Sequence, residues 1–363
     1  MALPKNTDDK ILSLVTKTKT TFSGRFFCTF AFYNFQEVIQ QDRIFSISHS
    51  ADFTTLTLEV FDWQYHHNAV YREFCDYLNK NPDNVSRIYE IPFLPITFFK
   101  SKSIITGNGN PERIFTSSGT TGSEVSQHLV TDISVYENSF RKGFTYFYGN
   151  IKDYAVLALL PSYLERQGSS LIYMAEDMIR QSEHPSSGFY LHNLDELAET
   201  LSRLEEQNQP TILIGVSFAL LDLIEKYQFD LKHTIVMETG GMKGRRKEMI
   251  RAELHEVLKI GFGVQHIHSE YGMTELLSQA YSKGNGVFDC PPWIQMLIRD
   301  TEDPLTILPD GKAGGINIID LANINSCSFI ATQDLGRKYP DGQFEVLGRF
   351  DDADIRGCNL LLG

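Results

Sequence analysis

The sequence has few residues of the kinds that build cross-links, metal sites or membrane spans. Cysteine accounts for 5 of its 363 residues, at positions 28, 75, 290, 327 and 358. None of these forms a Cys-x-x-Cys pair, and no Cys/His spacing fits a zinc site. No apolar run reaches the ~18–20 residues of a membrane span, and the N-terminus lacks the apolar core of a secretory signal. These absences predict a cytoplasmic protein with reduced thiols, most of them small buried side chains.

Positive charge is also in short supply. The chain carries 33 Lys and Arg against 46 Asp and Glu, a formal net charge of -13. Broad binding to nucleic acid needs clustered cations, so this composition argues against it, although a small basic pocket for one nucleotide is compatible with it. With 42% hydrophobic residues, the chain is typical of a globular protein. Its length allows two domains or one large α/β domain.

Apolar runs of strand length alternate with helical stretches from about residue 110 onward. This alternation predicts parallel strands joined by crossover helices. The expected strands are residues 112–117, 154–160, 211–216, 234–238 and 264–271, and the expected helices are residues 193–207, 218–228 and 244–260. Segments rich in Gly, Asp and Pro at 300–320 and 333–350 predict a small antiparallel subdomain attached to this α/β core.

Two segments of the first hundred residues also carry a structural signal. Residues 70–80 have helical periodicity, which places Val70, Phe74, Tyr77 and Leu78 on one face. Pro92 and Pro95 exclude a regular helix or a central strand for residues 91–100.

The stretch FTSSGTTGSE, residues 115–124, is the most informative motif. It places an unbroken run of small and hydroxylated residues directly after an apolar strand. Gly119 and Gly122 permit tight turns in which backbone N–H groups converge on an anion, and the Ser and Thr hydroxyls add donors. The Gly-Lys-Ser/Thr ending of a Walker A loop is absent. The run therefore favours phosphate binding over a plain Ser/Thr/Gly turn.

Three later stretches offer groups that suit the rest of a nucleotide. In SEYGMTEL (269–276), Tyr271 offers a flat ring, Thr274 a hydroxyl and Glu275 a carboxylate suited to Mg²⁺. TQDLGRK (332–338) contributes Asp334 as an acceptor for a ribose diol, and GRFDDADIRG (348–357) contributes Arg349 as a donor. Taken singly, each of these stretches is an ordinary turn or surface ion pair.

Taken together, the order of these four motifs resembles the motif set of the adenylate-forming superfamily, which includes acyl-CoA synthetases and phenylacetate-CoA ligase. The resemblance spans residues 115–358. IPFLPITFFK, LLPSYLERQGSSLIYM, ETGGMKGRRKEM and the terminal IRGCNLLLG resemble one branch, the acyl-protein synthetases of the bacterial luminescence fatty-acid reductase complex. The resemblance implies a layered α/β core with largely parallel sheets and a small antiparallel β subdomain, an adenylate-forming domain over 1–348 and a tail over 349–363. The superfamily's usual C-terminal domain, which bears a catalytic lysine, is expected to be absent.

The resemblance also implies roles for single residues. The phosphate run holds the ATP phosphates, Gly240 to Met242 border the adenine and acyl pocket, Tyr271 stacks on adenine, Thr274 meets the α-phosphate, and Asp334 binds the ribose with Arg349 beside it. Glu275 is the expected Mg²⁺ ligand. The residues expected to bind ATP are Thr116, Ser117, Ser118, Gly119, Thr120, Thr121, Gly122, Gly240, Gly241, Met242, Tyr271, Gly272, Met273, Thr274, Asp334 and Arg349. The acyl pocket is expected to draw on Tyr163, Phe218, Met242 and Met273.

The sequence departs from the superfamily pattern in its cations. Glu124-Val125 stands where Pro-Lys usually follows the phosphate run, and the chain stops about a dozen residues after Arg349. The expected sources of positive charge during catalysis are Arg349 and the basic run that contains Lys243, Arg245 and Arg246. As a start to a helix, that run conflicts with the helix dipole, which favours acidic residues there.

The resemblance implies a ligase that uses ATP and Mg²⁺ to convert a carboxylic acid, in this branch a fatty acid, to an acyl-adenylate with release of pyrophosphate. It also implies that the acyl group then passes to a thiol, with Cys358 as candidate, and on to a partner resembling an acyl-CoA reductase. A phenylacetate-CoA ligase-like enzyme that uses free CoA is the first alternative.

Two alternatives come from other classes of protein. A serine hydrolase would use Ser217 as its nucleophile, but Ala219 stands where the tight elbow requires glycine. A non-catalytic nucleotide-binding subunit is the other. His266 and His268 are expected to be structural residues rather than metal ligands.

Overall fold

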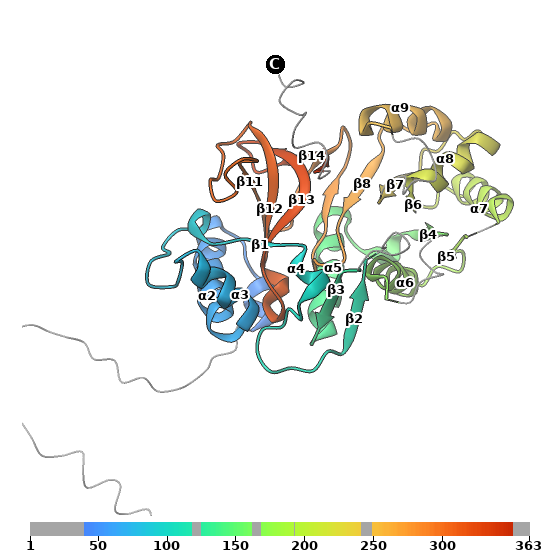
Figure 1. Cartoon of the computed structure of the whole chain (residues 1–363). Coiled ribbons are helices and arrows are strands. Elements are labelled where there is room, and N and C mark those ends of the chain that lie inside the picture. Colours follow the sequence, from blue (N-terminus) through green and yellow to red (C-terminus); the bar gives the residue numbers. More distant parts are fainter. Residues whose placement is uncertain (1–39, 118–124, 162–167, 192, 241–248, 351–363) are drawn as a thin grey trace, which may run out of the picture. The chain divides into compact units, whose positions relative to one another are not determined.

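The computed structural model describes residues 40–117, 125–161, 168–191, 193–240 and 249–350 (Figure 1). They all belong to one unit, Ile39–Gly363, whereas the other unit, Met1–Val38, lies outside the described residues. The expected mixture of a parallel sheet and an antiparallel sheet is confirmed. None of the described helices is both long and apolar enough to cross a membrane.

The first sheet is parallel over most of its width and supports the Tyr271 motif. Its strands, in spatial order, are β5 (Gly188–Phe189), β4 (Ala155–Leu159), β6 (Thr211–Val216), β7 (Thr234–Thr239), β8 (His268–Tyr271) and β9 (Ala280–Ser282). Only β9 runs antiparallel to its neighbour. All residues of β4 and β6 are buried, as continuous apolar runs in a parallel sheet should be. The run at 264–271 yields a shorter strand than expected, so His268 lies in β8 and His266 precedes it.

Helices connect these strands in the expected alternation. They are α6 (Ser170–Ser182), α7 (Leu194–Glu206), α8 (Ser217–Lys226) and α9 (Arg251–Phe262). The side chains of Asn193 and Ser169 accept hydrogen bonds from backbone N–H groups in the first turns of α7 and α6, which fixes where these helices begin. The carboxyl ends of β7 and β8 therefore lie side by side, with Thr239 opposite Glu270.

The second sheet is antiparallel and carries Asp334 and Arg349. Its main path is β10 (Val287–Phe288), β14 (Phe344–Arg349), β13 (Phe329–Lys338), β12 (Ala313–Asp320) and β11 (Ile294–Arg299), and β1 (Leu94–Pro95) pairs with β13. This confirms the predicted antiparallel subdomain. The register places Asp334 directly opposite Arg349, which is the last residue of β14.

The strand expected at 112–117 forms, but the prediction that it joins the parallel strands is wrong. β2 (Arg113–Thr116) pairs antiparallel with β3 (Gln127–Val130) in a two-stranded sheet of its own. The two strands hold the ends of the Ser/Thr/Gly run. The residues of β3 look polar in the sequence and do not by themselves indicate a strand. The strand forms because β2 pairs with it.

The remaining helical elements are mostly N-terminal. They are α1 (Gln41–Phe45), α2 (Ser50–His67), α3 (Ala69–Tyr77), η2 (Ile88–Glu90), α4 (Phe98–Ser101), α5 (Ile133–Tyr148), η3 (Ile151–Asp153) and η4 (Leu321–Asn325). The buried Gln64 amide of α2 donates to the Asn323 and Ile324 carbonyls and accepts from Ser328 N–H, which joins α2 to the antiparallel subdomain.

The helix predicted near residues 70–80 is confirmed as α3, but its expected apolar face is wrong at Tyr77. This side chain is 79% exposed, whereas Tyr71 and Cys75 are buried. Tyr77 is the last residue of α3, where a helix no longer needs to present a side chain to the core.

Candidate functional site

The base of the hairpin formed by β2 and β3 lies next to the Tyr-Gly-Met-Thr-Glu turn. Ser117 N–H donates to the Ser126 carbonyl (3.1 Å), and Ser126 N–H donates to Ser117 Oγ (2.9 Å). These bonds close the base of the hairpin. The Ser126 side chain in turn hydrogen-bonds the Glu275 carboxylate. The hairpin and the turn are therefore joined through one serine.

A buried histidine makes a second connection between the same two segments. His128, in β3, lies 2.9 Å through Nδ1 from the Thr274 carbonyl. A carbonyl only accepts, so Nδ1 carries the proton and Nε2 is a bare acceptor. Burial lowers the pKa of His128 to about 4, against the Thr274 hydrogen bond. The imidazole is therefore neutral at physiological pH and acts as a fixed donor to the turn.

Glu275 lies in the interior beside this junction, with 5% of its surface exposed. Burial raises the pKa of the Glu275 carboxyl, while the Ser126 hydrogen bond and the nearby charge of Arg349 lower it. In the described residues no group of three or more His, Cys, Asp or Glu side chains is placed to hold a metal ion. Mg²⁺ is commonly held by one or two carboxylates together with substrate phosphates. A single buried carboxylate next to the hairpin that is expected to bind phosphate fits that requirement.

The backbone after Glu275 is anchored to the antiparallel subdomain. Asp320, at the end of β12, accepts from Leu277 N–H and Ser278 N–H (both 3.0 Å) and from the Ser278 hydroxyl (2.6 Å). Burial raises the pKa of Asp320 to about 6, and these hydrogen bonds oppose the rise. The turn is thus held from the β3 side and from the β12 side.

Tyr271, Asp334 and Arg349 form a separate cluster. Tyr271 donates from its hydroxyl to Asp334 Oδ2 (2.8 Å), and Arg349 Nε lies 3.4 Å from Asp334 Oδ1. Burial raises the pKa of Asp334, whereas the Tyr271 hydrogen bond and the Arg349 charge lower it. The structure therefore brings together the three residues that sequence reasoning assigned to the nucleoside.

The Tyr271 ring packs against protein aromatics. It meets Phe288 and Phe344 nearly edge-on, with ring centroids 5.9 and 5.7 Å apart, and only 8% of the residue is exposed. Its predicted stacking on adenine stays a prediction. In the described structure its hydroxyl orients Asp334.

Glycines line the chain beside Tyr271. A Cβ on Gly272 would come 2.5 Å from Glu270 Oε1, so a larger residue would collide with that carboxyl. Gly240 follows β7 with φ of 68°, a conformation that glycine adopts without strain. Met273 and Thr274 are half-buried, and Thr116 N–H donates to the Gly168 carbonyl (2.8 Å).

Ser217 is placed as a structural residue. It is 2% exposed, and its hydroxyl lies 3.3 Å from both Glu238 Oε2 and the Gly240 carbonyl. A nucleophile needs access to substrate and a base that takes its proton. This hydroxyl instead anchors the end of β7, which argues against the hydrolase alternative.

Several predicted site residues lie outside the described residues. They are Ser118, Gly119, Thr120, Thr121, Gly122, Tyr163, Gly241, Met242, Lys243, Arg245, Arg246 and Cys358. Their roles stay predictions.

The sequence carries no signal for three residues that lie next to the predicted ones in the structure, Ser126, His128 and Arg251. Each of them contacts segments that are distant in the chain.

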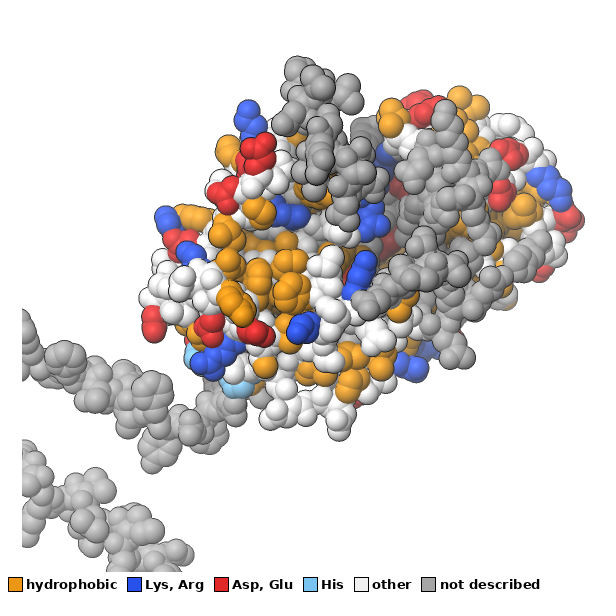
Figure 2. Space-filling model, viewed as in Figure 1, with side chains coloured by type: hydrophobic (Ala, Val, Ile, Leu, Met, Phe, Trp, Pro, Cys, Tyr) orange, Lys and Arg blue, Asp and Glu red, His pale blue; other side chains and the backbone are white. Residues whose placement is uncertain are grey.

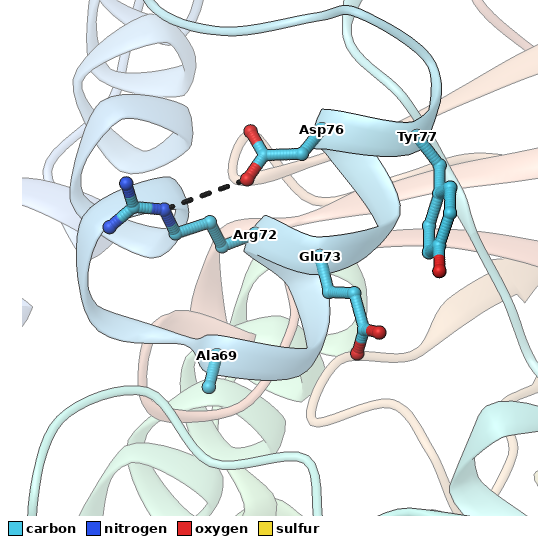
Figure 3. A pocket seen from close by; sticks show the side chains of 5 residues that line it. All are labelled: Ala69, Arg72, Glu73, Asp76 and Tyr77. Carbon is cyan, nitrogen blue, oxygen red and sulfur yellow. Dashed lines mark ion pairs between the residues drawn. The ribbon is translucent and has the colours of Figure 1, made fainter.

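A surface cavity of about 430 Å³ lies along α3 (Figure 3). None of the predicted site residues lines it. Its lining residues are Ala69, Arg72, Glu73, Asp76 and Tyr77. On the face shown in Figure 2, acidic and basic side chains are interspersed over the described residues.

Comparison with known proteins identifies the family to which this chain belongs. The model of the acyl-protein synthetase family, LuxE, matches residues 35–363. The long-chain-fatty-acid–luciferin-component ligase of Vibrio harveyi is 24% identical over 325 residues, which cover 83% of this chain and 84% of that protein. The enzyme of the same name from Photorhabdus luminescens is 41% identical over 68 residues, which cover 18% of this chain and 58% of that protein.

Solved structures share the fold. A 2-hydroxyisobutyryl-CoA ligase in complex with 2-HIB-AMP and CoA superposes with a TM-score of 0.63 at 13% identity, covering 84% of this chain and 72% of that one. ATP-bound MatB from Rhodopseudomonas palustris gives 0.51 at 19% identity over 67% of this chain. This match spans about half of the MatB chain, 49%. The relatives confirm the predicted class of enzyme, a ligase, and the chain belongs to the acyl-protein synthetase family.

Proposed function

We propose that this chain activates a fatty acid with ATP to give an acyl-adenylate and pyrophosphate, and then passes the acyl group to a thiol. Family membership and the ligase names of the relatives support acid activation. The observation that carries the proposal is the convergence of the hairpin, the Glu275 turn and the Asp334–Arg349 pair. His128 joins the hairpin to the turn through Thr274, and Tyr271 at the start of the turn joins it to Asp334.

The first half-reaction needs positioning and charge neutralisation more than a protein nucleophile. A carboxylate oxygen attacks the α-phosphorus, and the bond from that phosphorus to the bridging oxygen breaks, so that pyrophosphate leaves with the electron pair. Asp334 accepts from the ribose hydroxyls, the hairpin donates to the phosphates, and Thr274 is held near them through His128. Glu275 would hold Mg²⁺, which when bound would supply positive charge to neutralise the phosphates.

The second half-reaction transfers the acyl group. A thiolate attacks the acyl carbonyl carbon, a thioester forms, and AMP leaves. Cys358 is the proposed acceptor and an acyl-CoA reductase-like protein the proposed destination. In the described residues Cys75 and Cys327 are buried and Cys290 half-buried, and burial raises the pKa of the Cys75 thiol to about 12. These thiols are poor acceptors, which favours a cysteine elsewhere in the chain.

The test is ATP–pyrophosphate exchange with a panel of carboxylic acids, followed by mass measurement of the protein after incubation with ATP, Mg²⁺ and the best acid without CoA. The proposal predicts exchange with long-chain acids and a covalent acyl adduct that is lost in Cys358→Ala. Exchange without an adduct, together with turnover that depends on CoA, would assign the CoA-ligase alternative. No exchange with any acid would contradict acid activation.

A further inference from the structure

Arg251 lies next to the Tyr271 cluster with part of its donor capacity unused. It is the first residue of α9, and its Nε is 3.5 Å from Glu238 Oε1. Its Nη1 is buried and has no hydrogen-bond partner among the described residues. A buried donor without a partner is costly, particularly on a charged group. The ion pair with Glu238 therefore uses only some of the hydrogen-bond donors of this side chain.

A chain of contacts leads from Arg251 through Phe288 and Tyr271 to Asp334. The guanidinium lies over the Phe288 ring, 4.9 Å from its centroid, and Phe288 packs on Tyr271 with centroids 5.9 Å apart. The Tyr271 hydroxyl then donates to Asp334. Gly286 gives the arginine room, because a Cβ there would come 3.1 Å from Arg251 Cδ.

The charges agree with this placement. Burial raises the pKa of Asp334, and Arg251 is among the groups that lower it, after Tyr271 and Arg349. The same arginine helps to lower the pKa of Glu238, against the effect of burial and together with the His255 hydrogen bond. Arg251 thus acts electrostatically on carboxylates of both sheets.

We propose that Arg251 is a nucleotide-binding residue that donates from Nη1 to a ribose hydroxyl. An ionised carboxylate only accepts and a guanidinium only donates. A ribose hydroxyl satisfies both side chains, because it donates its proton to Asp334 and accepts a hydrogen bond from Arg251. This inference rests on the proposed function, because it takes the ribose of ATP to lie at Asp334.

The first experiment measures equilibrium binding of ATP, 2′-deoxy-ATP and 3′-deoxy-ATP with Mg²⁺ and without acid. Arg251→Met keeps the length of the side chain and removes its donors. Loss of a hydrogen bond to a charged group predicts about 10-fold weaker binding of ATP or more. At least one deoxy-nucleotide, which lacks the accepting hydroxyl, should bind the variant within about twofold of the wild type.

Arg72→Met is the matched control. Arg72 also has an acidic neighbour, Asp76 at 3.8 Å, and also lies over an aromatic ring, that of Tyr65 at 5.4 Å. It lies on α3 along the surface cavity (Figure 3). This variant should bind all three nucleotides like the wild type. Equal losses for all three nucleotides in Arg251→Met would overturn the hydroxyl contact, as would no loss.

A second measurement needs no variant. Phenylglyoxal labels arginines, and peptide mass spectrometry reads each site in the wild-type chain. Mg²⁺–ATP should protect Arg251, whose side chain is 30% exposed, and leave Arg72, at 53%, unprotected. Binding of ATP without protection of Arg251 would refute the inference alone. Failure of the wild type to bind ATP would instead refute the proposed function and the inference with it.

Discussion

The two sides of the candidate site differ in what their hydrogen bonds join. On the hairpin side, Ser117, Ser126 and Thr274 are held through their backbone groups by one another or by His128, whose buried Nε2 has no partner among the described residues. On the side expected to bind the nucleoside, the Asp334 carboxylate faces the side chains of a tyrosine and an exposed arginine, and Arg251 Nη1 likewise has no partner in the part of the chain that the structure describes. The first side is a framework that positions backbone, and the second presents side chains with capacity left for a ligand.

The largest effect should follow removal of the Asp334 charge. In Asp334→Asn the side chain keeps its size but loses the charge that accepts from the ribose, so kcat/KM for ATP should fall about 100-fold. ATP–pyrophosphate exchange measures this. Asp310→Asn is the control, because Asp310 is an exposed residue paired with Lys338. Equal activity of the Asp334 and Asp310 variants would erase the distinction between the two sides.

His128 tests whether the hairpin side works only by positioning. His128→Leu removes the donor to the Thr274 carbonyl and should lower kcat about 10-fold, with a smaller change in KM for ATP. His128→Asn places an amide N–H where Nδ1 stands and should restore kcat to within a few fold. If Asn were as poor as Leu, the hydrogen bond to Thr274 would not be the function of this histidine.

Tyr271→Phe separates the ring from the hydroxyl. The Tyr271 hydrogen bond lowers the pKa of Asp334, so its loss should raise that pKa further above its ordinary value. The carboxylate form then persists only at higher pH. KM for ATP should therefore rise about threefold to tenfold as pH falls from 8 to 6, more steeply than in the wild type. A parallel pair of pH profiles would contradict the coupling.

Glu270 provides the smallest and most local test, on stability rather than activity. Burial raises the pKa of Glu270 to about 7, Glu238 adds to the rise, and the Thr239 hydrogen bond (2.5 Å) opposes it. Because the folded pKa lies above the unfolded one, this group's contribution is fully present below about pH 4.5 and is lost as pH rises through 7.

Between pH 6 and pH 8 the free energy of unfolding should fall by about 1 kcal/mol through Glu270. Urea unfolding of the wild type and Glu270→Gln at both values measures this. The variant should lack that part of the decline. An identical decline in both proteins would show that Glu270 is already ionised in the fold, as Asp334 must be for its proposed role.

The sequence predicts the centre of the parallel sheet well because the strands there are buried on both faces. β4 and β6 appear as apolar runs, and no tertiary contact is needed to recognise them. β3 is different, since Gln127 and His128 read as polar and the strand exists through its pairing with β2. Tyr77 shows the limit of periodicity, which does not say where a helix stops facing the core.

The motif residues could be predicted as a set, whereas the contacts between them could not. Asp334 and Arg349 stand opposite each other only because β13 and β14 pair in one register. Arg251 belongs to a basic stretch that reads as a solvated start of a helix, and its partner ring, Phe288, lies far away in the sequence. His128 has no local signal for its bond to Thr274.

The most direct test of the account is a crystal structure with Mg²⁺ and a non-hydrolysable ATP analogue. It should show the ribose hydroxyls at Asp334, with the phosphates at the hairpin that begins at Ser117. A nucleotide bound along α3, or anywhere that leaves both Asp334 and the hairpin without contact, would contradict it.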